Sequence, residues 1–220
     1  MTKDALKQLY PFLSEDSGAT DKSPDNESLL QALTEKAEHS AQTKLAFIEQ
    51  NGQTLIDAAQ AMAKTFAAGG KLLCMGNGGS SCDASHLAVE FNHPVSVGRP
   101  PLPAVNLAAD TAMLTATSND VGYALAFQRQ VMALGRAGDT LVGLSTSGES
   151  ENLCQAFTAA KNMGLTTVAF IGGDGSKLRA LGVDHILCVP GNNIHRIQES
   201  HVLAYHCLWD VVHSLLAKRL

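Results

Sequence analysis

The segment at residues 71–90 constrains the fold of this chain more than any other part of the sequence. Apolar residues 72–75 indicate a buried strand, and three glycines within residues 76–79 indicate a tight turn whose backbone can approach a ligand. Ser80 and Ser81 are expected to cap a helix that begins there. The start of a helix presents backbone N–H groups at the positive end of the helix dipole. The segment therefore predicts a phosphate-binding turn between a strand and a helix.

This turn matches neither of two common nucleotide-binding motifs. It lacks the Gly-Lys-Ser/Thr of a P-loop, and Ser81 stands where the dinucleotide fingerprint has its third glycine. Taken alone, the glycines are explained equally well by a plain strand-to-helix turn, so the phosphate prediction needs support from elsewhere in the chain.

Beyond Glu90 the sequence alternates between strand-like and helix-like segments. Helical crossovers imply parallel strands with helices on both faces, so we predict an α/β fold, a five-stranded parallel sheet flanked by helices in a flavodoxin-like three-layer sandwich. Ligands of such sheets bind beyond the carboxyl ends of the strands. The loops after the first, third and last strands are therefore the ones to examine. The expected strands are residues 72–75, 103–107, 140–144, 166–171 and 185–189.

A second polar loop follows the strand expected at residues 140–144. Ser145, Thr146, Ser147 and Ser150 open the next helix, where their hydroxyls and the free backbone amides suit a phosphate. Helix capping is the alternative for any one serine, and for Ser150 above all. A cap needs only one hydroxyl, so four of them favour a ligand.

His86 and Glu90 lie four residues apart on the helix expected after the glycine turn. Their side chains project from one face toward the same point, a spacing that suits a divalent metal with nitrogen and oxygen ligands. A solvated pair on an exposed helix face is the alternative.

The first part of the chain predicts a tail and a helical region. Residues 1–27 hold a short apolar patch, which predicts a small docking helix, and a polar run at 14–26, which predicts a linker. Residues 28–68 have a helical pattern that is broken near Asn51 and Gly52, so two helices joined by a turn are expected. We assign residues 28–220 to one domain that includes this helical pair.

Composition excludes several classes of function. The net charge is −5 and no Lys/Arg cluster is present, so a nucleic-acid surface is not expected. No basic segment precedes an apolar core at the N-terminus, and no apolar run is long enough to span a bilayer, so we expect no membrane association and a cytoplasmic protein. The five cysteines are odd in number and never spaced as Cys-x-x-Cys, which favours reduced thiols with packing roles.

Several motifs in matching order are together similar to the sugar isomerase (SIS) family, and within it to the phosphoheptose isomerases. The resemblance covers roughly residues 28–217. It implies conversion of sedoheptulose 7-phosphate to D-glycero-D-manno-heptose 7-phosphate, used for the heptose of bacterial lipopolysaccharide, in a homotetramer with sites between subunits and usually with zinc. The motifs are Gly76-Asn77-Gly78-Gly79-Ser80, His86 with Glu90, Asn119-Asp120, Ser145-Thr146-Ser147-Gly148-x-Ser150, and Arg196-Ile197-Gln198-Glu199 with His206.

The resemblance also implies roles for individual residues. Glu90 and His206 would be catalytic, and His86, Glu90, Gln198 and His206 would bind zinc. The substrate would be held by Asn77, Gly78, Gly79, Ser80, Glu90, Asn119, Asp120, Ser145, Thr146, Ser147, Ser150 and Gln198.

The chemistry of such a reaction fits these residues. Converting a ketose into an aldose requires removal of a proton beside a carbonyl and its return to the neighbouring carbon, which needs a base and an acid or Lewis acid. Glu90 and His206 suit those roles. A carboxylate fully engaged by zinc is a poor base, so either Glu90 loosens from the metal when substrate binds, or the metal is inhibitory or structural.

The segment after Glu90 departs from the pattern of the family. Phosphoheptose isomerases tend to carry an arginine a few residues past this glutamate, whereas here residues 91–94 read Phe-Asn-His-Pro. Either Arg99 takes the place of that arginine, or the substrate is a different sugar. The five histidines at 93, 185, 195, 201 and 213 have no matching partner spacing and are expected to be exposed or to have their hydrogen bonds satisfied.

Two other classes of function compete with an enzyme. A non-catalytic branch of the same family binds the replication initiator DnaA, and residues 99–103 and 207–210 are similar to it. Retention of the full set of four expected zinc ligands favours the enzyme. A sugar-phosphate-sensing regulator would need a DNA-binding segment, which residues 1–70 do not supply.

Gln198 and His206 also predict a site shared between chains. Eight residues separate them on one expected helix, which places their Cα atoms about 12 Å apart along the axis and turns their side chains by about 80°. One metal cannot easily take both from one straight helix. We therefore expect one of them to come from a neighbouring subunit.

Overall fold

The structure, a computed structural model, describes residues 25–217. The docking helix and almost all of the linker expected at residues 1–27 lie outside the described residues. The chain divides into two compact units, residues 1–37 and 38–220. None of the described helices is long and apolar enough to cross a membrane.

Residues of both units belong to one continuous helix, α2 (Asn26–Ala67), so the prediction of two helices with a turn near Asn51 and Gly52 is wrong. Asn51 explains the error. Its amide nitrogen donates to the carbonyls of Phe47 (3.0 Å) and Cys188 (2.9 Å), and its amide oxygen accepts from Cys188 N (3.0 Å). An asparagine that signals a turn by local preference here joins a helix to a distant strand, and this tertiary contact outweighs the local preference.

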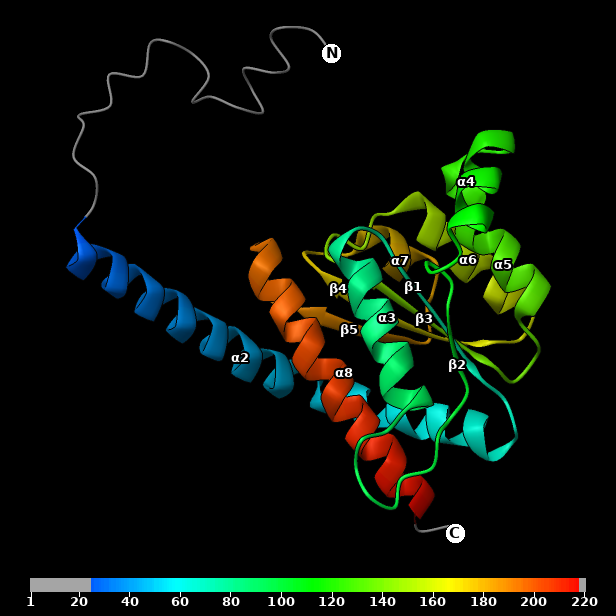
Figure 1. The fold of residues 1–220 in the computed structure, drawn as a ribbon, viewed down its shortest axis with the longest axis horizontal. Coiled ribbons are helices and arrows are strands. Elements are labelled where there is room, and N and C mark those ends of the chain that lie inside the picture. Colours follow the sequence, from blue (N-terminus) through cyan, green and yellow to red (C-terminus); the bar gives the residue numbers. More distant parts are fainter. Residues whose placement is uncertain (1–24, 218–220) are drawn as a thin grey trace, which may run out of the picture. The chain divides into compact units, whose positions relative to one another are not determined.

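The second unit is built on a five-stranded, all-parallel sheet with the order β2-β1-β3-β4-β5 (Figure 1), which confirms the predicted α/β architecture. Every strand expected from the sequence is present, with ends shifted by one residue at most. The strands are β1 (Leu72–Gly76), β2 (Ala104–Asn106), β3 (Thr140–Ser145), β4 (Thr166–Gly172) and β5 (His185–Val189).

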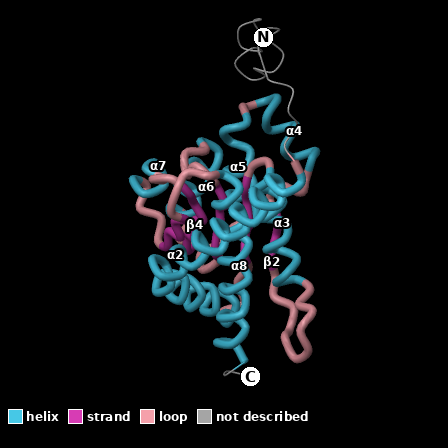
Figure 2. The backbone as a smooth tube through the Cα atoms, turned by 90° about the vertical axis from the view of Figure 1, so that its left-hand side faces the viewer, coloured by secondary structure: helices cyan, strands magenta, loops and turns pink. Residues whose placement is uncertain are grey.

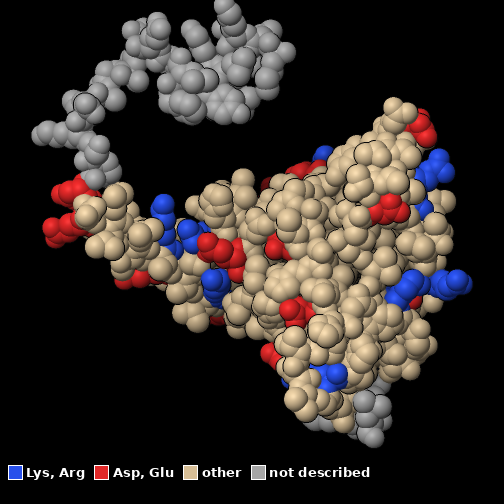
Figure 3. Space-filling view, viewed as in Figure 1, with Lys and Arg blue, Asp and Glu red and all other residues tan. Residues whose placement is uncertain are grey.

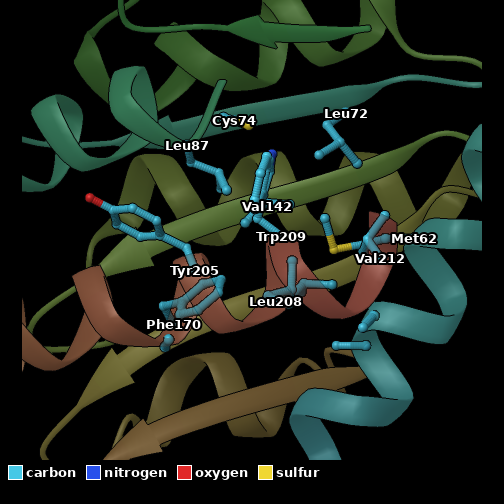
Figure 4. Close-up of a cluster of buried hydrophobic side chains, with 14 of the residues drawn as sticks. Met62, Leu72, Cys74, Leu87, Val142, Phe170, Tyr205, Leu208, Trp209 and Val212 are labelled. Atoms are coloured by element: carbon cyan, nitrogen blue, oxygen red, sulfur yellow. The ribbon is translucent and has the colours of Figure 1, made fainter. Parts of the chain in front are cut away.

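Helices connect the strands and lie against both faces of the sheet (Figure 2). On one face, residues of α2, α3 and α8 pack on alternate strand residues such as Cys74, Val142 and Phe170 (Figure 4). On the other face, α5 and α6 pack on the intervening residues, such as Met75 and Leu141. This alternation follows from the period of two along a strand. The remaining elements are α3 (Gly79–Asn92), α4 (Thr111–Asp120), the 3-10 helix η2 (Tyr123–Leu125), α5 (Ala126–Leu134), α6 (Glu151–Asn162), α7 (Ser176–Ala180) and α8 (Ile194–Ala217).

The five cysteines are all free thiols. Cys74 and Cys154 are buried, in agreement with a packing role, and burial raises the pKa of the Cys74 thiol to about 12. Cys82 is exposed on α3, so a packing role is wrong for that residue. On the face shown in Figure 3, acidic and basic side chains are interspersed.

His201 on α8 should make the stability of the fold depend on pH. The residue is 0 % exposed, packs against Phe170, and burial lowers the pKa of its imidazole from 6.5 to about 4. As the pH falls, the unfolded chain takes up a proton near pH 6.5 while the folded chain stays neutral to about pH 4. The free energy of unfolding should therefore fall over this interval, by up to about 3 kcal/mol.

Urea denaturation at several pH values between 7 and 4 measures this effect. His201→Gln keeps a polar side chain but cannot titrate. Its free energy of unfolding should therefore fall less between pH 7 and pH 4 than that of wild type, by up to about 3 kcal/mol. Equal losses in the two proteins would show that another group causes the acid sensitivity.

Candidate active site at the carboxyl edge of the sheet

The glycine turn after β1 leads directly into α3. Gly78 occupies the N-cap position with φ +54°, a backbone conformation that favours glycine. The helix begins at Gly79, so the expected capping by Ser80 and Ser81 is wrong: Ser80 lies within the first turn, and Ser81 Oγ donates back to the carbonyl of Gly78 (2.7 Å). A glycine rather than a serine makes this turn, because the chain needs a positive φ there.

Asn77, at the centre of the turn, is held by two neighbours that the sequence did not identify. Its amide exchanges two hydrogen bonds with the amide of Asn152 on α6 (2.9 and 2.8 Å). Tyr123 Oη donates to Asn77 Oδ1 (2.7 Å). The turn after β1 is thereby tied to the helix that follows the serine loop, and the two loops expected to bind phosphate lie at one edge of the sheet.

The serine loop after β3 uses part of its hydrogen-bonding capacity internally. Ser145 Oγ accepts from Gly148 N (3.0 Å), and Ser147 Oγ accepts from Glu149 N (3.2 Å). Ser150 is the N-cap residue of α6, but its side chain makes no capping hydrogen bond. Capping therefore does not account for this serine. Thr146 and Ser147 line a pocket of about 340 Å³, together with Gly173, Asp174 and the start of α8.

Asn119 and Asp120 lie at the end of α4 and are exposed, with Asn119 Nδ2 donating to Asp120 Oδ1 (2.8 Å). Asp120 lines a separate pocket with Thr117 and Arg129. Within the described residues, no hydrogen bond joins this pair to the serine loop or to α3, so the structure does not bring them together with the other predicted site residues in a direct contact.

Helices α3 and α8 lie side by side (Figure 1) and are joined by three polar contacts in register. Gln198 Nε2 donates to Asp83 Oδ2 (3.0 Å), and Tyr205 Oη is bonded to His86 Nδ1 (2.7 Å). Trp209 Nε1 donates to the main-chain oxygen of Glu90 (2.8 Å). The partners advance together along both helices, so α3 and α8 run in the same direction.

Three side chains on this pair of helices converge as metal ligands do. One ligand atom each from His86, Glu90 and His206 lie within 4.8 Å of one another. His86 Nε2 and Glu90 Oε1 are 3.0 Å apart, and the two imidazole centroids are 5.1 Å apart. Two imidazoles and a carboxylate form a donor set that zinc accepts. The residues present therefore fit a divalent metal.

Gln198, the fourth expected metal ligand, is placed differently. Its amide is bonded to Asp83 and lies so close to the start of α3 that a Cβ at Gly79 would come 2.4 Å from Gln198 Nε2. Gly79 is thus required by the close approach of Gln198. Within one chain, the structure assembles three of the four expected ligands and holds the fourth on Asp83.

Comparison with known proteins identifies the family. The SIS domain model matches residues 37–172. The chain belongs to the SIS domain family. Among its relatives, the phosphoheptose isomerase of Roseiflexus sp. (strain RS-1) is 43% identical over 194 residues, 87% of this chain and 96% of the relative. That of Aquifex aeolicus is 39% identical over 191 residues, 87% and 100% of the two chains.

Solved structures place this SIS chain in the same group. Phosphoheptose isomerase GmhA from Neisseria gonorrhoeae superposes with a TM-score of 0.79 at 38% identity, covering 84% of this chain and 99% of that one. A phosphoheptose isomerase from Francisella tularensis gives 0.80 at 36% identity, covering 84% and 98%. Within the SIS family the chain therefore groups with enzymes.

Electrostatics favour a cation at the converging side chains of this SIS site. Burial raises the pKa of the Asp83 carboxyl, against the opposing effects of its bond to Gln198 and of nearby His86. Burial, together with the charges of Asp83 and Glu90, raises the pKa of Tyr205. Negative charge from Asp83 and Glu90 thus acts on the Tyr205 hydroxyl, which is bonded to His86.

Arg99 does not lie among the converging ligands within this chain. Its guanidinium stacks 4.4 Å over the ring of Trp209 and pairs with Asp210 (3.1 Å). Nη1 of Arg99 is buried with no hydrogen-bond partner among the described atoms. Inside one SIS subunit, Arg99 packs against α8 and does not reach His86 or Glu90 by any described hydrogen bond or ion pair.

Proposed function

We propose that this SIS enzyme, grouped by its relatives with the phosphoheptose isomerases, converts sedoheptulose 7-phosphate to D-glycero-D-manno-heptose 7-phosphate through an enediol. The observation that carries the proposal is the convergence of Glu90 with His86 and His206 between the paired helices α3 and α8. A carboxylate beside two imidazoles can supply the general base and the general acid that proton transfer between adjacent carbons requires.

Glu90 is the base in this proposal. Its carboxylate removes the proton from the carbon beside the ketose carbonyl and returns it to the neighbouring carbon, which yields the aldose. His206, from the facing helix, donates and accepts the proton at the sugar oxygens. Both side chains are only partly exposed, so water is partly excluded from the reacting atoms.

His86, Glu90 and His206, with Gln198 as a fourth ligand, would hold zinc. A bound zinc ion would act as a Lewis acid that polarises the carbonyl of the substrate. In this scheme Glu90 serves both as a metal ligand and as the base. Either Glu90 leaves the metal when substrate binds, or the metal is inhibitory or structural. A catalytic metal and an inhibitory metal predict opposite responses to a chelator.

Turnover of sedoheptulose 7-phosphate by the full chain tests the proposal. The aldose product should appear with wild-type protein, and treatment with a chelator should abolish the reaction if the metal is catalytic or enhance it if the metal is inhibitory. Absence of product both with and without added Zn²⁺ would overturn the proposed reaction.

The serine loop holds the phosphate of the substrate in this proposal. Ser145→Ala, Ser147→Ala and Ser150→Ala should each weaken sugar-phosphate binding by about 1–2 kcal/mol, because each removes a hydrogen bond to a charged group. The change should appear mainly in KM, and in the Kd for inorganic phosphate measured by calorimetry. Thr158→Ala, which removes a hydroxyl bonded to the Cys154 carbonyl within α6, is the matched control. Unchanged phosphate affinity in a variant that carries all three alanine substitutions would rule out the loop as the phosphate site.

A homotetramer with shared sites completes the proposal. Within one chain, Gln198 is occupied by Asp83, and His206 joins His86 and Glu90. A Gln198 from a neighbouring subunit would supply the fourth ligand without unwinding α8. Symmetric assembly would repeat that contact in every subunit.

The alternative of a DnaA-binding protein has no support from the relatives named above, which are all phosphoheptose isomerases. The two segments that are similar to the DnaA-binding branch lie against each other, since Arg99 stacks on Trp209 and pairs with Asp210. Packing within the chain therefore explains them.

A further inference from the structure

Tyr205 combines complete burial with a polar contact to a candidate metal ligand. The residue is 0 % exposed, yet its hydroxyl oxygen lies 2.7 Å from Nδ1 of His86, with the two rings edge to face at 5.3 Å. Figure 4 shows the ring beside the apolar cluster and its oxygen directed away from Leu208, Trp209 and Val212. The apolar body of the tyrosine is thus anchored in the core, and its polar tip reaches the site.

We propose that Tyr205 is a positioning residue for His86: its hydroxyl binds Nδ1 and so leaves Nε2 as the nitrogen that faces Glu90. The inference rests on the metal site proposed above. Nε2 lies 3.0 Å from Glu90 Oε1, on the side of the cluster. A neutral imidazole that binds a metal through one nitrogen keeps its proton on the other, and a partner for that proton fixes the ring. A phenol oxygen can accept a hydrogen bond from this N–H, and the hydroxyl can donate one when the tautomer is reversed.

The same side chain also fixes the second imidazole. His206 follows Tyr205 directly on α8, and their rings lie 4.9 Å apart. Since the Tyr205 ring packs in the core beneath α3, it sets the rotation of α8 at the point where His206 leaves the helix. One buried residue thereby orients two of the three converging ligands, one by a hydrogen bond and one through the backbone.

Metal affinity tests the proposal without reference to the sugar reaction. The full chain is stripped of metal, and Zn²⁺ and Co²⁺ are titrated in competition with a chromophoric chelator. Tyr205→Phe removes one oxygen and should raise the Kd for either metal about 10- to 100-fold, the usual effect of losing a partner of a metal-bound histidine. The visible spectrum of bound Co²⁺ should also change. Tyr123→Phe, which removes the same atom from a contact with Asn77, is the matched control and should leave the metal Kd unchanged.

Two outcomes would overturn the proposal. Equal Kd values and equal Co²⁺ spectra for Tyr205→Phe and wild type would overturn the positioning role while leaving the metal site in place. If the His206→Ala variant binds metal as tightly as the wild-type chain, the metal lies elsewhere, and both the site and the inference fail. Sugar turnover is not measured in the Zn²⁺ or the Co²⁺ titration. A failure of the proposed sugar reaction would therefore leave the result of these titrations unchanged.

A measurement on the wild-type protein covers the case in which Tyr205→Phe does not fold. In the zinc-loaded chain, nitrogen NMR of the His86 ring should show the proton on Nδ1 and the metal on Nε2. Metal on Nδ1 would overturn the proposal, since that nitrogen would then not be held by Tyr205.

Discussion

Glu90→Gln is expected to lower kcat for sedoheptulose 7-phosphate isomerisation by about 10²- to 10⁴-fold, the usual contribution of a positioned general base. Glutamine keeps the volume of the side chain and can still accept a hydrogen bond from His86, but it cannot take up a proton at neutral pH. The loss should fall on kcat more than on KM, because the proposed function assigns substrate binding mainly to the loops. Initial rates with purified protein measure both constants.

Two controls make the Glu90 result interpretable. Glu35→Gln makes the same chemical change at an exposed position of α2, where the carboxylate accepts a hydrogen bond from Gln31, and should leave kcat unchanged. A thermal unfolding midpoint near that of wild type would show that Glu90→Gln is folded. Near wild-type turnover by a folded, metal-loaded Glu90→Gln would mean that another residue is the base.

Mixed oligomers of two inactive variants should recover activity if the site is shared between subunits. Gln198→Ala and His206→Ala are each expected to be inactive. In random hybrids about a quarter of the shared sites combine an intact Gln198 from one chain with an intact His206 from another. Unfolding the two variants together and reassembling them should therefore restore about a quarter of the wild-type rate per site.

A second pair of variants provides the matched control. His86 and Glu90 lie four residues apart on α3 of the same chain, so hybrids of His86→Ala and Glu90→Ala should remain inactive. Recovery by the first pair and not by the second would show that Gln198 and His206 of one site come from different subunits. If verified hybrids of the first pair stay inactive, each site is built from a single chain.

The sheet could be predicted closely from the sequence, because each of its strands is a short apolar run bounded by polar or glycine residues. The continuity of α2 could not be predicted, since it depends on Asn51 binding the main chain of Cys188, 137 residues away. Local preference indicated a turn, and a distant strand supplied the partners that stabilise the helix instead.

The candidate site could also be predicted only where its pattern is local in the sequence. The spacing of His86 and Glu90 is a local pattern, whereas His206 entered only through the resemblance to a family. Tyr205 and Asn152 were not identified, because their contacts join residues 119 and 75 positions apart and have no signature in either segment alone. The expected caps at Ser80 and Ser81 failed because the turn needs a positive φ, which moved the start of the helix to the glycines.

The three contacts between α3 and α8 also limit how the gene can change in length. Gln198, Tyr205 and Trp209 meet Asp83, His86 and the Glu90 carbonyl in one fixed register. Deleting a single residue between Gln198 and Tyr205 would turn the rest of α8 by about 100° and shift it by about 1.5 Å, so the two ends of the helix could no longer meet their partners together. An insertion or deletion after Trp209 leaves all three contacts in place. Frame-preserving length variation between Gln198 and Trp209 should therefore not be tolerated.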